Sequence, residues 1–373
     1  MLYMRKSDFL FILSAFLIWR ITLFVFLFLA LKYLPLQQNF LGGGMQNYLS
    51  NPWFWSWVNF DGEHYLTIAQ VGYQPLTYFY FPVFPLLARF LGNLLGGGFT
   101  NYALAGLAVS QLAFFAALIG FWKLIRLDFN KKIARLGILL LLFFPTSFYF
   151  ASYYTESVFL ASVVWSFYLT RRDKWFWAGV LGGVSSATRI IGATLLPALL
   201  TEKNRKWPIL LIPAGILIYM YYLNIETGDP LNFLNTVSIF GAQRSSNIIF
   251  LPQVFYRYFV KIIPNLDYNY FPVIFVTFLE ILVAVLFLAL LLLGIRKVKW
   301  SYLVYAALAY LIPTFSGSFS SFPRYALVIF PAFIIAALYL NKLPRVVQTL
   351  IFALLFVGLG LATCLFLRGY WVS

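Results

Sequence analysis

The run FLFILSAFLIWRITLFVFLFLAL, from Phe9 to Leu31, decides the class of fold. Its only charged residue is Arg20. A helix needs about 20 apolar residues to cross the hydrocarbon core of a bilayer, so this run predicts a membrane-spanning helix. The run is too long for the core of a signal peptide and is followed by no small-residue cleavage site, so we expect it to be retained.

Similar apolar runs recur as far as Leu367, and hydrophobic residues make up 62% of the 373 residues. Because every backbone polar group inside a bilayer must be satisfied internally, this pattern predicts an all-α polytopic membrane protein. The longest segments outside the apolar runs are residues 32–100 and 225–272. We therefore expect one integral membrane domain over residues 1–373, with its site built from helices and these two loops.

The formal net charge is +16, which in a soluble protein would suggest a nucleic-acid partner. Here the basic residues form short clusters between apolar runs, which is the pattern of cytoplasmic loops. The sequence thus predicts membrane lipids and no nucleic acid as partners. The basic clusters are Arg5 and Lys6; Lys123, Arg126, Lys131, Lys132 and Arg135; Arg171, Arg172 and Lys174; Lys203, Arg205 and Lys206; Arg296, Lys297 and Lys299; Lys342 and Arg345.

Two stretches do not fit a simple count of crossings. Residues 78–95 are apolar but contain Pro82, Pro85 and Arg89, and a crossing there would place the basic loop 123–135 outside. We expect this stretch to be interfacial or re-entrant.

The second stretch, residues 175–200, would be about 39 Å long as one helix, yet basic clusters lie at both of its ends. The chain must therefore cross an even number of times, and we expect two short helices that turn near Arg189.

With that hairpin the bundle has about eleven transmembrane helices, and residues 32–100 and 225–272 lie outside. The first of these loops is expected to carry short interfacial helices. The predicted spans are 9–31, 101–122, 136–152, 156–170, 175–187, 190–200, 208–224, 273–295, 300–313, 324–340 and 346–367.

Ionisable residues outside the basic clusters gather on the outer face in this topology. They are Asp61, Glu63 and His64 in the first outer loop, Glu156, Arg189 and Arg324. Arginine holds phosphate through forked, charge-assisted hydrogen bonds. Acids and bases converging at the level of lipid head groups indicate a site for an anionic, partly lipidic substrate.

Each of these residues also has a structural alternative. Taken alone, Asp61 is more readily an N-cap for a helix that begins there, with Glu63 as a favourable acid in its first turn or a solvated side chain. His64, the lone histidine, is a neighbour of Asp61 rather than a metal ligand, since one histidine does not make a metal site. Glu156 fits a helix cap equally well, and Arg189 and Arg324 fit snorkelling to head groups.

Two charges lie inside predicted spans. Arg20 has about eleven apolar residues on each side, and Glu280 lies within residues 273–295. Charges in the membrane are rare and usually functional or structural, so we hypothesise that Arg20 pairs with Glu280 or another buried acceptor and holds the bundle together.

The first outer loop resembles a known family. Residues 59–73, NFDGEHYLTIAQVGY, resemble the first-loop signature of the GPI mannosyltransferase 2 (PIG-V-like) family, with Phe60 where that family usually has Trp. Residues 81–87, FPVFPLL, resemble a second segment of the family. Supporting matches follow in the family's order at FPTS (144–147), YTES (154–157), SATR (186–189) and PRY (323–325).

The resemblance implies a polytopic glycosyltransferase of the GT-C class that uses a polyprenyl-phosphate sugar, typically dolichyl-phosphate mannose, on the non-cytosolic side. It also implies that Asp61 is the catalytic base, which reverses the preference for a cap. Inverting transfer needs one base for the acceptor hydroxyl and positive charge for the leaving phosphate. We therefore expect Arg189 and Arg324 to hold phosphate and His64 to orient Asp61 or touch the acceptor.

The remaining expectations are less specific. Substrate-binding candidates are Glu63, Tyr65, Tyr154 and Glu156. No cofactor or metal is expected, because the chain has no Asp-x-Asp motif. The acceptor, a lipid, glycan or protein, is open, as is the membrane: the plasma membrane in a prokaryote, the endoplasmic reticulum in a eukaryote. Alternative functions are a transporter or flippase of lipid-linked sugars and a non-catalytic scaffold subunit.

Overall fold

The computed structural model describes residues 4–37, 45–235 and 248–372, and within these ranges the chain is helical with no β-strand. The predicted all-α class is confirmed. Five helical segments of the described chain are long and apolar enough to cross a membrane. They are α1 (Lys6–Tyr33), α6 (Phe99–Asp128), η4 with α11 (Trp207–Thr227), α14 (Phe271–Gly294) and α18 (Arg345–Leu367).

Shorter helices complete the bundle. They are α7 (Lys131–Phe143), η2 (Ser147–Ala151), α8 (Glu156–Thr170), α9 (Trp175–Ser186), η3 (Ile190–Thr194), α10 (Leu195–Leu200), α15 (Trp300–Thr314), α16 (Phe322–Ala326) and α17 (Phe330–Leu340). Each of the eleven predicted spans coincides with one of these helices or with two in succession. The chain is thus an integral membrane protein.

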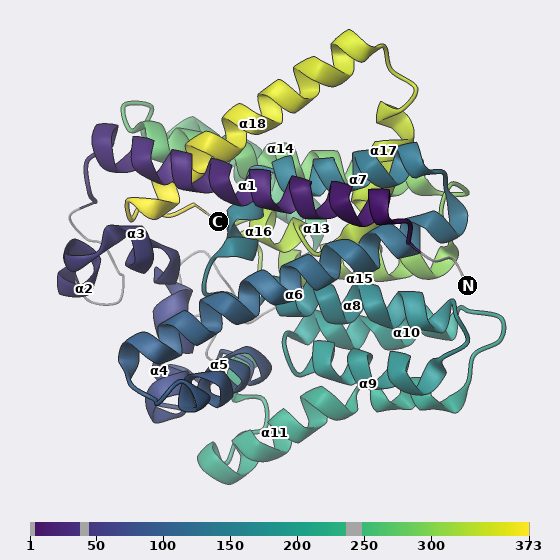
Figure 1. The fold of residues 1–373 in the computed structure, drawn as a ribbon, viewed down its shortest axis with the longest axis horizontal. Coiled ribbons are helices and arrows are strands. Elements are labelled where there is room, and N and C mark those ends of the chain that lie inside the picture. Colours follow the sequence, from purple (N-terminus) through teal and green to yellow (C-terminus); the bar gives the residue numbers. More distant parts are fainter. Residues whose placement is uncertain (1–3, 38–44, 236–247, 373) are drawn as a thin grey trace.

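Most helices of the bundle run across the page in Figure 1, with the amino terminus at the right and the short helices α4 (Asp61–Val71) and α5 (Val83–Leu94) at the lower left. We call the end where α1 finishes and α6 begins the outer end. The opposite, inner end carries the basic clusters, as the positive-inside rule predicts.

The predicted hairpin is present. Helix α9 stops at Ser186, the chain reverses through residues 187–189, and η3 and α10 run back. The turn is closed by hydrogen bonds from the amides of Thr188 and Arg189 to the carbonyl of Ser185, both 3.0 Å long. Arg189 therefore lies at the apex.

Small residues let α9 lie close to η4 and α11. A Cβ added at Gly179 would lie 2.0 Å from the carbonyl oxygen of Pro208, and one added at Gly215 would lie 2.0 Å from that of Gly183. Close backbone approach of this kind is typical of helix pairs in membranes. It packs the hairpin against the bundle on one side.

Helix α5 lies within the stretch predicted not to cross. Its twelve residues extend for about 18 Å, short of the roughly 30 Å hydrocarbon core. One side, with Phe84 and Ala88, is buried, while Leu86, Leu87 and Phe90 are exposed on the other. An amphipathic helix of this length is suited to the membrane surface.

The two outer loops contain the remaining short elements. The first carries α2 (Met45–Ser50), α3 (Pro52–Trp55) and η1 (Ser56–Val58) before α4 and α5. The second carries α12 (Asn232–Asn235), α13 (Leu251–Tyr256), the π-helical turn η6 (Arg257–Ile262) and η7 (Ile263–Asn265). The expected short helices of the first loop are thus present.

The connection between α7 and α8 matters most for the site. Every residue from Phe144 to Thr155 is buried. Helix α8 has 15 residues and is only about 22 Å long, so its first residue, Glu156, begins inside the bundle rather than at its surface.

Candidate active site

Asp61 opens α4 at a sharp turn of the first outer loop. Phe60 before it has φ 54°, a conformation that is rare for a bulky residue. Asp61 is not the N-cap: that position is Phe60, and no side chain caps the helix. The structural alternative for Asp61 is therefore wrong, since its carboxylate is used elsewhere.

The loop that presents Asp61 is tied to the bundle by Asn59. Its side-chain amide donates to the carbonyl of Phe366 at 3.2 Å, and its own carbonyl accepts from the hydroxyl of Tyr154 at 2.8 Å. The amide of Tyr153 also donates to the carbonyl of Trp57 at 2.8 Å. These bonds hold the start of α4 against the buried 144–155 connection.

Arg324 of α16 reaches Asp61 from a distant part of the chain. Its Nη1 donates to Asp61 Oδ2 and its Nε donates to Glu156 Oε1, while its side chain is only 6% exposed. Arg189 donates from Nη1 to the same oxygen of Glu156 at 2.6 Å. The four residues form one chain of ion pairs: Asp61, Arg324, Glu156, Arg189.

Glu156 lies at the centre of this chain, and its side chain is fully buried. Its Oε1 accepts from both arginines, whereas its Oε2 is buried without a hydrogen-bond partner among the described residues. A buried carboxylate oxygen left without a donor is costly. Glu156 Oε2 can therefore accept a hydrogen bond from one more donor.

Aromatic rings surround the two guanidinium groups. The Arg324 guanidinium carbon lies 4.5 Å from the Tyr154 ring centre and 5.0 Å from that of Tyr149, and the Arg189 carbon lies 5.1 Å from that of Tyr325. Cation–π contacts of this kind stabilise a desolvated guanidinium. They fix both arginines in place without using their N–H groups.

Tyr80, which sequence reasoning missed, donates its hydroxyl hydrogen to Asp61 Oδ1 at 3.2 Å. Its ring stacks on His64 with centres 4.9 Å apart and meets Tyr65 edge-on at the same distance. A tyrosine within the apolar stretch YFYFP carries no sequence signal of such a role. The hydroxyl of Tyr80 and Nη1 of Arg324 hold the two oxygens of Asp61.

The neighbours of Asp61 on α4 lie in a half-buried layer. Burial lowers the pKa of His64, with the charge of Asp61 acting in the opposite direction. Burial raises the pKa of Glu63 to about 7, and Glu63 Oε1 has no hydrogen-bond partner among the described residues. Burial thus favours the neutral form of both side chains.

The remaining predicted substrate-binding residues lie in the wall of the site. Tyr65 is 5% exposed and Tyr154 is 1% exposed. Tyr154 holds the first loop through Asn59 and supports Arg324 with its ring. Among the described residues, no group of three or more His, Cys, Asp or Glu side chains is arranged to hold a metal ion.

The hypothesis that Arg20 pairs with Glu280 or another buried acceptor is wrong, since Arg20 forms no ion pair with the described residues and its Nη1 is buried without a hydrogen-bond partner among them. The Arg20 guanidinium instead lies over two aromatic rings, 4.4 Å from the centre of Phe24 and 4.3 Å from that of Trp57. Glu280 accepts from the hydroxyl of Tyr258 at 2.8 Å. Arg20 lies on α1 and contacts η1, whereas Glu280 lies on α14 and contacts η6, so the two charges have different partners.

No protein-family pattern matches the chain, and no curated protein matches it in sequence. Solved structures do match it in fold. ArnT from Cupriavidus metallidurans bound to undecaprenyl phosphate matches with a TM-score of 0.51 and 16% identity over 95% of this chain and 63% of that one. ArnT in the apo state matches with a TM-score of 0.50 and 17% identity, covering 96% and 72%.

The apo oligosaccharyltransferase of Archaeoglobus fulgidus matches with a TM-score of 0.50 and 14% identity, covering 96% of this chain and 56% of that one. This chain thus spans less than two thirds of the ArnT chain in its complex with undecaprenyl phosphate, and a little over half of the oligosaccharyltransferase. At these identities the likeness concerns the fold. The chain has the all-helical GT-C membrane fold that ArnT and the oligosaccharyltransferase share.

Proposed function

We propose that this protein is a glycosyltransferase that moves a sugar from a polyprenyl-phosphate donor to an acceptor hydroxyl at the outer end of the bundle. The observation that carries the proposal is the buried chain Asp61–Arg324–Glu156–Arg189. Asp61, the proposed proton acceptor, is ion-paired with Arg324, which shares Glu156 with Arg189, and the two arginines are the proposed phosphate-binding groups. The GT-C fold, shared with a protein that binds undecaprenyl phosphate, supports the same assignment.

Both arginines keep donors for a phosphate. Arg324 uses Nη1 and Nε in its ion pairs and Arg189 uses only Nη1. Their other guanidinium N–H groups make no hydrogen bond with the described residues. Arginine forks match phosphate oxygens well, so these free N–H groups are the proposed contacts to the donor.

The transfer step follows from this arrangement. The acceptor oxygen attacks the anomeric carbon, the bond from that carbon to the phosphate oxygen breaks, and the polyprenyl phosphate leaves with the bonding electron pair. The acceptor proton passes to Asp61. As Asp61 loses its charge, Arg324 is less strongly held by it and its positive charge acts on the departing phosphate, where negative charge develops.

The sugar-binding role falls to Glu156. Its buried Oε2 has no hydrogen-bond partner among the described residues, so we assign it the role of accepting a hydrogen bond from a sugar hydroxyl. His64, stacked on Tyr80, would lie against the acceptor, with Glu63, Tyr65 and Tyr154 in the surrounding wall. Mannose as the sugar is proposed from the resemblance of residues 59–73 to the PIG-V-like family.

The test uses purified protein in liposomes, polyprenyl-phosphate mannose with a radiolabelled sugar, and membranes from cells that lack the protein as the source of acceptor. The wild type should attach label covalently to lipid, glycan or protein. Asp61→Asn should lower the rate by about 10²–10⁴-fold, the usual contribution of a general base, and should keep the wild-type melting temperature within a few degrees.

Asp267→Asn is the matched control, since Asp267 is an exposed aspartate of the second outer loop. It should transfer at the wild-type rate. Near-normal transfer by Asp61→Asn would remove Asp61 from the mechanism. Labelled donor that crosses the liposome membrane without covalent attachment to acceptor would identify a transporter instead.

A further inference from the structure

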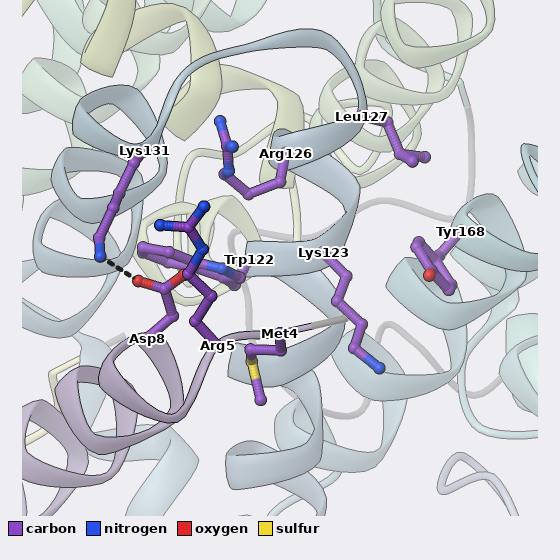
Figure 2. A pocket seen from close by; sticks show the side chains of 9 residues that line it. All are labelled: Met4, Arg5, Asp8, Trp122, Lys123, Arg126, Leu127, Lys131 and Tyr168. Atoms are coloured by element: carbon purple, nitrogen blue, oxygen red, sulfur yellow. Dashed lines mark ion pairs between the residues drawn. The ribbon is translucent and has the colours of Figure 1, made fainter. Parts of the chain in front are cut away.

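A polar cavity lies at the inner end of the bundle, opposite the proposed active site. Its volume is about 290 Å³, and it is lined by the start of α1, the end of α6, the start of α7 and Tyr168 of α8. Figure 2 shows Arg5, Asp8 and Lys131 gathered near Trp122, with Tyr168 on the far side of Lys123. Polar groups from the start of α1, from the connected ends of α6 and α7, and from α8 thus meet in one cavity.

The charges of this cavity are unbalanced. Arg5, Lys123, Arg126 and Lys131 line it, against one carboxylate, Asp8. Asp8 forms an ion pair with Lys131. Arg126 donates from Nη1 to the carbonyl of Phe129 at 2.6 Å. This bond uses one N–H group of the guanidinium but does not neutralise the positive charge of Arg126.

The other two cations are Arg5 and Lys123. Among the described residues neither Arg5 nor Lys123 forms an ion pair, and the ammonium group of Lys123 lies 5.3 Å and 5.9 Å from the ring centres of Trp165 and Tyr168. Aromatic contacts hold an ammonium group in place but leave its charge available. The cavity is therefore suited to an anion.

The cavity also has an apolar wall. Met4, Leu127 and the buried Trp122 line the same cavity. Phe9 and Leu10, which follow Asp8 on α1, are exposed, and the bilayer would cover them. A free phosphate ion would use the cations and leave this apolar wall unused.

We infer that this cavity binds the phosphate-bearing head group of an anionic lipid from the inner leaflet, with its acyl chains along the exposed face of α1. Basic pockets between membrane helices on the cytoplasmic side bind anionic head groups in this way. The cavity takes no part in the proposed transfer reaction, which lies at the other end of the bundle.

A second inner cavity provides the matched comparison. It has a volume of about 390 Å³ and is lined by Lys297 and Lys342 together with Asp128. Asp128 is already bound by both terminal nitrogens of Arg171. Removing its two lysines changes the charge of the inner face by the same amount as removing Arg5 and Lys123.

The experiment measures lipid retention by native mass spectrometry of the full chain, delipidated in detergent and then titrated with phosphatidylglycerol or with phosphatidylcholine of the same acyl chains. The wild type should bind one phosphatidylglycerol in preference to phosphatidylcholine. Each basic residue contributes about a factor of five at an anionic lipid surface. The R5Q/K123Q double variant should therefore bind phosphatidylglycerol about 30-fold more weakly, whereas K297Q/K342Q should bind it like the wild type.

Three results would overturn the inference: equal affinity for both lipids, unchanged affinity in R5Q/K123Q, or an equal loss in K297Q/K342Q, which would indicate diffuse attraction to the inner face. Glycerol 3-phosphate, added alone, distinguishes the sources of phosphate, because affinity equal to that of the lipid would assign the cavity to a soluble ligand. Melting temperatures without lipid check that the variants fold. If the double variant does not fold, K123Q alone should show about a fivefold loss.

Discussion

Arg324 donates from Nη1 to Asp61 Oδ2 although 263 positions separate the two residues in the chain. The arginine comes from α16 and the carboxylate from the first residue of α4. The proposed base and the proposed phosphate-binding group are therefore one hydrogen-bonded unit. A change in the charge of Asp61 therefore affects Arg324, and the reverse holds as well.

Removing Arg324 should destabilise the fold as well as impair transfer. Arg324→Ala would leave two carboxylates, Asp61 and the fully buried Glu156, without their shared cation. Breaking a buried ion pair in this way costs about 3–5 kcal/mol, which should appear as a lowered melting temperature in detergent. Arg324→Lys should recover only part of the loss, because a single ammonium group cannot reproduce the Nε and Nη1 bridge.

The control for this prediction is Arg172→Ala, since Arg172 is exposed at the inner end. It should melt like the wild type. Adding Glu156→Gln to Arg324→Ala should cost less than Glu156→Gln alone, because the two residues interact directly. Additive losses in this cycle would contradict the paired arrangement.

Tyr80 should act on turnover more than on donor binding. Its hydroxyl holds Asp61 Oδ1, and Tyr80→Phe removes that bond while keeping the ring stacked on His64. We expect kcat to fall about tenfold, the effect of losing roughly 1.5 kcal/mol of a hydrogen bond to a charged group, with the KM for donor unchanged. Tyr153→Phe is the matched control, since among the described residues the Tyr153 hydroxyl bonds one group, the backbone carbonyl of Tyr102. An equal loss in both variants would assign Tyr80 a packing role alone.

Much of the fold could be predicted because composition and charge act at the scale of whole helices. Apolar runs between basic clusters located the spans, and the even number of crossings required between residues 175 and 200 located the turn at Arg189. The residues of the site could be gathered onto one face by the same topology. The ion pairs of Arg189 and Arg324 could not be predicted. The same topology puts three acidic residues on that face, Asp61, Glu63 and Glu156, and does not say which of them each arginine contacts.

Two features depend on packing that the sequence does not encode locally. Tyr80 approaches Asp61 because α4 and the segment before α5 fold against each other, and nothing in YFYFP distinguishes it from Tyr78. Arg20 and Glu280 were each correctly placed within a helix. The direction in which a side chain points around a helix, however, depends on its neighbours in the bundle, so their pairing was wrong.

Arg20 should be coupled to Trp57 rather than to Glu280. Its guanidinium lies 4.3 Å from the centre of the Trp57 ring, and a desolvated cation–π contact is worth about 2 kcal/mol. Arg20→Gln should lower the melting temperature. In a double-mutant cycle, Arg20→Gln should cost much less stability in a Trp57→Leu background than in the wild type. The exchange Arg20→Glu with Glu280→Arg should give no rescue of yield. Recovery in that exchange would restore the rejected pair.

Glu63 should make stability fall as pH rises. Burial raises its pKa from 4.5 to about 7 in the folded chain, so the folded state binds the proton more tightly than the unfolded state does. The resulting stability is present at low pH and is lost between about pH 4.5 and 7, by up to about 3 kcal/mol. Glu63→Gln, which cannot ionise, should melt only slightly higher than the wild type at pH 5 and clearly higher at pH 8. Glu226→Gln, at an exposed position, should show no such growing difference.

His64 titrates in the opposite sense, because burial lowers its pKa and its contribution to stability is lost as pH falls. His64 is present in both proteins, so comparing Glu63→Gln with the wild type at each pH removes its contribution. A difference in melting temperature that stays constant from pH 5 to pH 8 would show that Glu63 is already ionised in the folded chain.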